Sequence, residues 1–201
     1  MTRYLLRILD YIFRMAPGFL LAAALFLALY GLRKRRLTCL GWYSLPLREG
    51  VLLLFWMFCG GMAMLTLTPG WFDWRSELLY GGHSGSFFAL GSVNLTPFQT
   101  FSMEGHSLFL LLGNIVMFIP FGFFAALLWR GFTWRRALIT GIAITGFIEC
   151  WQMLVGRAFD IDDLMLNTLG VFCGFLLSPV LRRLFPRFTE KLTVSPFISS
   201  D

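Results

Sequence analysis

Residues 137–181 read ALITGIAITGFIECWQMLV, GRAFD and IDDLMLNTLGVFCGFLLSPVL, which are two apolar runs joined by a short polar turn. A helix that crosses a membrane needs about 20 consecutive apolar residues, and about 17 is the lower limit. The runs 137–155 and 161–181 meet this requirement. This stretch therefore predicts a hairpin of two membrane-spanning helices, with residues 156–160 at the turn between them.

Three further apolar runs precede this hairpin, at residues 17–32, 51–67 and 108–129. The chain of 201 residues is 57% hydrophobic and only 14% charged, whereas soluble domains average about 25% charged residues. A soluble globular protein is therefore excluded. We expect an all-α polytopic membrane bundle of about five spans, in which the run 17–32 is marginal in length and leaves the side of the N-terminus open.

The basic residues indicate which ends of the runs face the cytoplasm. The net charge is +6, and Lys and Arg gather after the first, third and fifth apolar runs. Cytoplasmic loops of membrane proteins carry such an excess, so residues 33–50, residues 130–136 and the C-terminal segment are predicted to be cytoplasmic. The excess charge thus has a topological explanation and predicts no nucleic-acid partner.

The runs divide the chain into three parts. We expect residues 1–50 to contain an N-terminal amphipathic, interfacial helix, an anchor segment and a basic cytoplasmic loop. Residues 51–181 form the predicted membrane domain, and residues 182–201 a basic cytoplasmic tail. Pro17 is expected to mark the turn of the chain into the bilayer. The polar face of the interfacial helix is formed by Arg3, Arg7, Asp10 and Arg14, which recur at helical spacing.

Polar residues of three different runs converge near the outer edge of the membrane. The rise of a helix places Asn114, Glu149 and Asn167 about 9 Å below that edge. Polar side chains inside a membrane are costly and often mark functional sites. These residues therefore predict an outward-facing polar pocket, and the alternative is an interhelical hydrogen-bond network that only holds the bundle together.

Helical spacing adds neighbours to this group. Gln152 follows the glutamate by three residues and shares its face, and Asp163 shares a face with Asn167. Gly170 and Gly174 continue that second face toward the inner leaflet. Small residues at this spacing allow two helices to approach closely, so we expect a packing seam below the polar pocket.

The turn between the last two runs carries the remaining candidates. Arg157 is predicted to be the counter-ion of Asp160 and Asp163, because a guanidinium can bind carboxylates bidentately. The alternative is a salt-bridged turn that only sets the register of the helices. Asp162 lies about 100° away around the helix and is expected to face solvent. Asn94 lies in an outer turn that is expected to cap the pocket.

These residues, in this order, resemble the VanZ-like family of bacterial membrane proteins. The resemblance covers about residues 51–181 and implies a four-helix membrane domain in the bacterial cell (inner) membrane. The family is named after a protein that gives low-level resistance to the glycopeptide antibiotic teicoplanin. The residues that carry the resemblance are Asn94-Leu95-Thr96-Pro97-Phe98, Asn114 with Phe118, Pro120 and Gly122, Glu149 with Gln152, and Arg157 with Asp160, Asp163, Asn167 and Gly170.

The leading hypothesis is a cell-envelope protein whose polar pocket binds an envelope lipid, a lipid-linked glycan or a peptidoglycan precursor. Lower susceptibility to glycopeptides such as teicoplanin would be one consequence. The lipid bilayer is the expected surroundings, a homo-oligomer stays open, and no cofactor or metal is expected. The candidate ligand-binding residues are Asn94, Asn114, Glu149, Gln152, Arg157, Asp160, Asp163 and Asn167.

Three alternatives stay open at this point. The first is a membrane enzyme that acts on a lipid-linked envelope substrate, with Glu149 or Asp163 as the general base. The second is a small transporter, which is less favoured because the inner halves of the runs are almost purely apolar. The third is a divalent-metal site at Glu149, Asp160 and Asp163, since hard cations bind carboxylates.

Overall fold

The computed structural model of the chain describes residues 2–69, 72–75, 86–98 and 107–196. Helices dominate this part of the chain, because a backbone in lipid must satisfy its hydrogen bonds within the segment. The helices are α1 (Thr2–Cys39), α2 (Pro46–Leu67), α5 (Ser107–Leu128), α6 (Trp134–Leu154), α7 (Ile161–Leu184) and the short α8 (Pro186–Glu190). The strands have two residues each: β1 (Trp42–Tyr43), β2 (Val93–Asn94), β3 (Phe159–Asp160) and β4 (Ser195–Pro196).

Five of the described helices are long and apolar enough to cross a membrane. Many of their large apolar side chains are exposed, among them Leu20 (71%), Ile139 (67%) and Leu54 (57%). Such a surface is compatible with lipid and not with water. The predicted all-α, multi-pass membrane bundle is confirmed.

Helix α1 differs from the expectation for the N-terminal segment. We predicted that the chain turns at Pro17, but Pro17 lies inside one continuous helix, so this prediction is wrong. Proline has no N–H to donate to the carbonyl four residues before it. The freed carbonyl of Phe13 instead accepts a hydrogen bond from Nε1 of Trp74 at 3.1 Å. The apolar run thus lies in a helix whose candidate span is Leu9–Cys39; the side chains of Arg3 and Arg7 lie outside the described residues.

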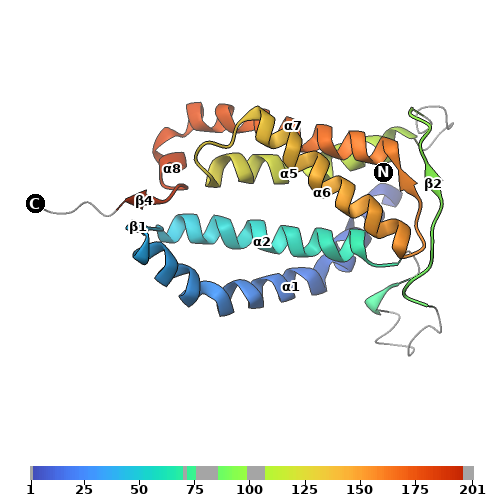
Figure 1. Ribbon diagram of the computed structural model, residues 1–201, viewed down its shortest axis with the longest axis horizontal. Coiled ribbons are helices and arrows are strands. Elements are labelled where there is room, and N and C mark those ends of the chain that lie inside the picture. Colours follow the sequence, from blue (N-terminus) through green and yellow to red (C-terminus); the bar gives the residue numbers. More distant parts are fainter. Residues whose placement is uncertain (1, 70–71, 76–85, 99–106, 197–201) are drawn as a thin grey trace, which may run out of the picture.

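The helices form two groups that lie along each other, α1 with α2 and α5 with α6 and α7 (Figure 1). Helices α5 and α7 pack closely because a Cβ atom on Gly170 would overlap the carbonyl oxygen of Ile115, and one on Gly174 that of Ile119. The predicted small-residue seam is therefore confirmed, and α5 is its partner. The core between the two groups consists of Met62, Phe118, Phe121, Ile148 and Val171.

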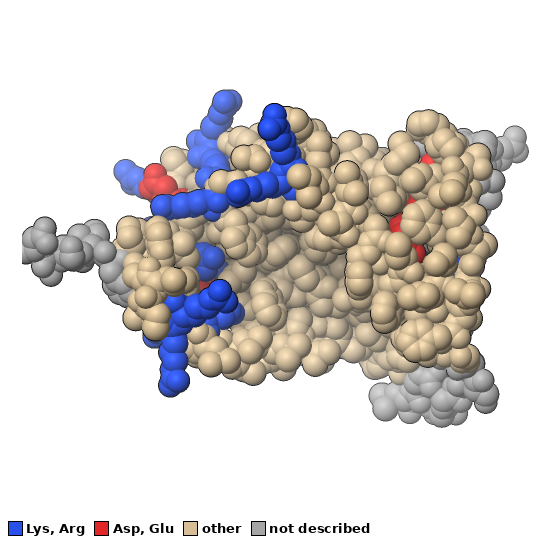
Figure 2. Space-filling view, in the orientation of Figure 1, with Lys and Arg blue, Asp and Glu red and all other residues tan. Residues whose placement is uncertain are grey.

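The two ends of the bundle differ in their connections and charge. At one end, β2 pairs in parallel with β3; at the other, β1 pairs antiparallel with β4 beside α8 (Figure 1). We call the second the basic end, because Lys and Arg gather there (Figure 2). Helix α7 continues beyond the predicted start of the tail at residue 182, and residues up to 196 fold back through α8 and β4.

Candidate functional site

The carboxylates of Glu149 and Asp160 lie close together at the end of the bundle opposite the basic end, where α6 is followed by the turn into α7. Asp160 is the N-cap of α7, where its Oδ1 accepts a hydrogen bond from the backbone N–H of Asp162 at 2.9 Å. Such a cap satisfies a helix N–H group that has no partner within the helix. Glu149, from the last turns of α6, is only 1% exposed, and its Oε2 accepts from the backbone N–H of Asp160 at 3.0 Å.

The segment that contains β2 lies against this turn. The backbone N–H of Phe159 donates to the carbonyl of Ser92 at 2.9 Å, and Nδ2 of Asn94 donates to Oδ2 of Asp160 at 3.2 Å. Gly91 approaches the turn so closely that a Cβ atom there would overlap the carbonyl oxygen of Arg157. The segment around Asn94 thus lies against the turn between α6 and α7.

Asp162 contradicts the expectation from helical spacing. It is 2% exposed, and its Oδ1 accepts a hydrogen bond from the backbone N–H of Phe98 at 2.6 Å. Phe98 has a φ angle of 64°, a left-handed conformation that is uncommon for a bulky residue. Spacing along α7 predicts the direction of a side chain but not that a segment 64 residues earlier covers it, so no sequence signal revealed this contact.

Helices α5 and α7 join through a second polar contact. Nδ2 of Asn114 donates a hydrogen bond to Oδ1 of Asp163, one turn nearer the start of α7 than Asn167, with which it was predicted to share a depth. Asn167 lies one turn deeper on α7 and is 5% exposed. Its Oδ1 is buried and has no hydrogen-bond partner among the described residues, so it is available as an acceptor.

Two predicted pocket residues contact a different element. Nε2 of Gln152 donates to the carbonyl of Thr66 at 3.2 Å, and Nη1 of Arg157 donates to that of Leu65 at 3.4 Å. Nε1 of Trp151 donates to the carbonyl of Leu67 at 2.8 Å. These carbonyls belong to the last turn of α2, where no later N–H group of the same helix is present to donate to them.

The direct, bidentate contact predicted between Arg157 and these carboxylates is therefore not observed. In the part of the chain that the structure describes, its guanidinium forms no salt bridge with Asp160, Asp163 or Glu149. The partial negative charge at the end of α2 attracts the cation instead. Sequence spacing placed Arg157 in the correct turn, but it contained no information about the end of α2.

We call the resulting group the acid cluster; it comprises Asn94, Asn114, Glu149, Asp160, Asp162 and Asp163. Three of its carboxylates, on Glu149, Asp160 and Asp163, have no ion pair among the described residues. Removing a carboxylate from water without a cation is costly. No group of three His, Cys, Asp or Glu side chains within the described ranges is arranged to hold a metal ion. Backbone N–H groups and amides thus provide the contacts that hold these acids.

Comparison with known proteins gives one match. A family model described as VanZ/LLP1 matches residues 52–182. This range begins in α2 and ends in α7, so it includes every helix that contributes to the acid cluster. No curated protein and no solved structure matches the chain.

Proposed function

The chain belongs to the VanZ/LLP1 family, and from this premise we propose that it is a cell-envelope membrane protein whose acid cluster binds a polar group of an envelope molecule. The observation that supports this proposal most strongly is the set of carboxylates on Glu149, Asp160 and Asp163 that form no salt bridge with any described residue. Costly polar groups near a membrane are retained where function requires them. A ligand would supply the missing donors.

The chemistry of the cluster favours a ligand that is rich in donors. Carboxylate oxygens accept hydrogen bonds, and the buried Oδ1 of Asn167 is a further acceptor without a partner in the described part of the chain. Hydroxyl, amide and ammonium groups are suitable donors, and lipid-linked glycans and peptidoglycan precursors carry them. Asp160, Asp163 and Asn114 are partly exposed, so such a group can reach them from the membrane surface.

The charge distribution supports an outward-facing site. By the positive-inside rule the basic end lies in the cytoplasm, and the acid cluster lies at the opposite end of the same helices (Figure 2). This orientation places the site at the outer leaflet of a bacterial cell membrane. Lower susceptibility to glycopeptides such as teicoplanin follows if the bound molecule is the target of these antibiotics or a precursor of that target.

Gln152 and Arg157 take a different part in this proposal. They hold the last turn of α2 against α6 and the turn after it, so they position the cluster without contacting the ligand. We expect Arg157→Ala to lower the abundance and thermal stability of the protein. Protection per folded molecule should persist, because the acid cluster keeps its own contacts.

A membrane enzyme is the second candidate, and the environment of Glu149 favours it. Its Oε2 accepts from Asp160, while no hydrogen bond to Oε1 is formed by the described residues. A buried carboxylate with a free oxygen can act as a general base toward a lipid-linked envelope substrate, and Asp163 is the other candidate for this role. Glu149→Gln separates the two functions: a binder loses affinity, whereas an enzyme loses product formation and keeps ligand binding.

The proposal is tested by glycopeptide susceptibility in a sensitive Gram-positive host. Wild-type protein, Glu149→Gln and Asp163→Asn are expressed at matched membrane abundance. We expect wild type to raise the inhibitory concentration of teicoplanin and both variants to lose this protection. Asp10→Asn is the control, because Asp10 lies outside the cluster and is paired with Arg14 and Arg75.

Two results would contradict the proposal in different ways. If both cluster variants protect as well as wild type, the acid cluster is not the binding site. If well-expressed wild type gives no protection, the glycopeptide consequence is wrong for this chain. Lipid profiles of the same strains then show whether an envelope lipid changes in a manner that depends on Glu149.

A further inference from the structure

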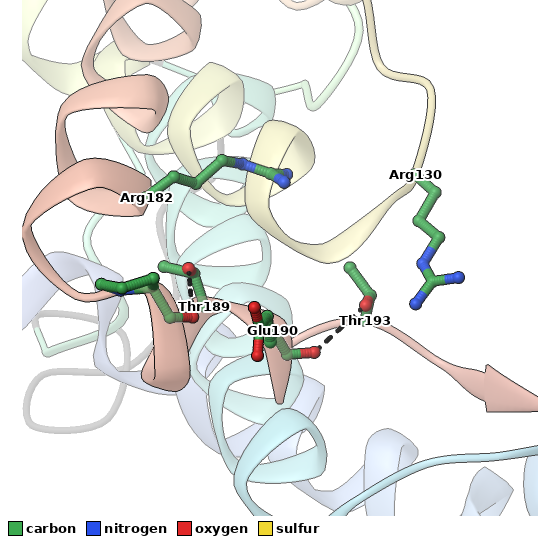
Figure 3. Close-up of a pocket in the computed structure, with 6 residues that line it drawn as sticks. Arg130, Arg182, Thr189, Glu190 and Thr193 are labelled. Carbon is green, nitrogen blue, oxygen red and sulfur yellow. Dashed lines mark hydrogen bonds between the residues drawn. The ribbon is translucent and has the colours of Figure 1, made fainter.

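Two adjoining cavities lie at the basic end, far along the helices from the acid cluster. The first has a volume of about 330 Å³ and the second of about 310 Å³. Both are lined by Arg130, from the turn after α5, and by Arg182 of α7. Figure 3 shows these two arginines extending from different elements, with Thr189 and Glu190 below Arg182 and Thr193 level with the guanidinium of Arg130 in this view. The arginines therefore lie at the boundary of the two cavities.

The two cavities differ in chemistry. The second is lined by the large apolar side chains of Trp129, Phe132 and Phe175, together with Pro179. The first is lined by the two arginines and by residues in and just after α8, namely Pro186, Thr189, Glu190 and Thr193. The threonine hydroxyls there already donate to backbone carbonyls: Thr189 to Phe185 and Pro186, and Thr193 to Glu190. The arginines are therefore the principal free donors.

The arginines retain most of their hydrogen-bonding capacity. Arg130 has no ion pair or hydrogen bond with any described residue. Arg182 donates through Nη2 to the carbonyl of Ala126 at 2.5 Å, which leaves its other N–H groups. Glu190 is the one acidic residue among those that line the cavities, and it forms no ion pair with either arginine. The excess charge at this boundary is positive.

We propose that the two cavities together bind one phospholipid with an anionic headgroup. The phosphate lies between Arg130 and Arg182, and an acyl chain enters the cavity lined by Phe132 and Phe175. The arginines lie where α5 ends at Leu128 and where the apolar part of α7 ends, which is the depth of a headgroup. Basic sites between helices at the cytoplasmic surface bind anionic lipids in this way.

Fluorescence quenching by brominated lipids tests the proposal, because Trp129 lines the apolar cavity. The full chain is reconstituted in phosphatidylcholine vesicles that contain a minor fraction of either phosphatidylglycerol or phosphatidylcholine with brominated chains. The signal of Trp129 is the difference between the wild type and Trp129→Phe. We expect brominated phosphatidylglycerol to quench it about fivefold more effectively than brominated phosphatidylcholine, the factor that corresponds to one arginine at an anionic surface.

Matched substitutions distinguish a specific site from general surface charge. Arg130→Gln should remove the preference for phosphatidylglycerol. Arg135→Gln should keep it, because Arg135 is an exposed arginine that lines neither cavity. Glu190→Gln should increase the preference, since it removes the opposing charge. Arg130→Lys keeps the charge and should keep part of the preference, which remains informative if Arg130→Gln does not fold.

Three results would overturn the proposal. The first is equal quenching of Trp129 by both lipids. The second is an equal loss of preference in Arg130→Gln and Arg135→Gln, which would indicate surface charge alone. The third is removal of the preference by inorganic phosphate, which would show that the arginines bind free phosphate and that the apolar cavity contributes nothing.

Discussion

Two glutamates at opposite ends of the bundle, Glu49, which is partly exposed, and Glu149, which is buried, have opposite surroundings. Glu49 of α2, at the basic end, is ion-paired with Arg33 and lies 3.6 Å from a nitrogen of Arg48. Glu149 of α6 forms no salt bridge with any residue that the structure describes and accepts one hydrogen bond from a backbone N–H group. The same side chain thus serves in one place as half of a structural ion pair. In the other it is a buried acid that forms no direct salt bridge within the described part of the chain, and we therefore propose the function there.

The largest expected effect is on the paired glutamate. Glu49→Gln removes the charge that compensates Arg33 and Arg48. Nη1 of Arg33 and Nε of Arg48 are already buried without a hydrogen-bond partner among the described residues. Leaving such cations uncompensated typically costs about 3 kcal/mol. We expect a clear fall in the thermal unfolding temperature of the protein in detergent. Glu190→Gln, an exposed acid at the same end, is the matched control. An unchanged melting temperature for Glu49→Gln would show that the ion pair is not structural.

A smaller effect is expected from Asp162, which attaches the outer segment to the acid cluster. Asp162→Ala removes the acceptor for the backbone N–H of Phe98 and should cost about 1–2 kcal/mol, the usual penalty for leaving a buried polar group without its partner. The loss should be local. We expect faster amide hydrogen exchange in residues 89–98 and unchanged exchange around α8. Faster exchange at both ends would mean that Asp162 supports the whole bundle, and Asp10→Asn serves as the control.

A partly exposed, paired acid, Asp73, gives a smaller effect that depends on pH. Asp73, in the loop after α2, accepts hydrogen bonds from Nε and Nη2 of Arg75, at 3.1 and 3.0 Å. These bonds lower the pKa of the Asp73 carboxyl from its ordinary value of 3.8. The contribution to stability is therefore present above that value and is lost as the pH falls through the lowered pKa. Asp73→Asn should reduce stability by about 0–1 kcal/mol near neutral pH.

Melting temperatures of Asp73→Asn and wild type, measured over a series of pH values, test this explanation. The difference in melting temperature between variant and wild type should shrink as the pH is lowered from about 6 to about 3. A difference that is constant over this range would show that the carboxylate charge is not its source. Glu49→Gln, measured in the same series, provides the comparison with a buried pair.

The smallest change in stability is expected for the unpaired glutamate itself. In Glu149→Gln the amide oxygen can still accept from the backbone N–H of Asp160, and the cost of a buried charge without a cation disappears. Stability should therefore stay within about 0.5 kcal/mol of wild type or rise. Melting in detergent checks this directly. A loss as large as that of Glu49→Gln would place both glutamates in the same structural class and would remove the main argument for function at the acid cluster.

Hydropathy was sufficient for the bundle but not for its first helix. The apolar runs predicted five spans because lipid excludes charge along about 20 residues. Pro17 led to a wrong prediction of a turn, since the rule for proline assumes that its lost hydrogen bond stays lost. Trp74, more than 50 residues away in the sequence, supplies that bond to Phe13. A remote donor of this kind is not visible in local sequence.

The candidate site was predictable in its depth and not in its pairing. Helical rise correctly placed Asn114 of α5 near the outer end of α7, but it matched Asn114 in depth with Asn167, whereas the observed partner is Asp163, one turn closer to the start of α7. The burial of Asp162 depends on the position of Phe98, and the contact of Arg157 with Leu65 depends on the position of the last turn of α2. The sequence of the α6–α7 hairpin does not predict where Phe98 or the last turn of α2 will lie.

The sequence by itself determined the class of the protein, the number of its apolar helices and the polar residues near one end, because the solvent acts on each run separately through its length and composition. Only the tertiary structure decided which polar groups meet. Hydrogen bonds act over about 3 Å, and at that range the partner of a side chain is whichever segment the packing of α2, α5 and α7 brings beside it. The carboxylates of Glu149, Asp160 and Asp163, which are held by amides and backbone N–H groups and form no salt bridge with the described residues, are a property of that packing.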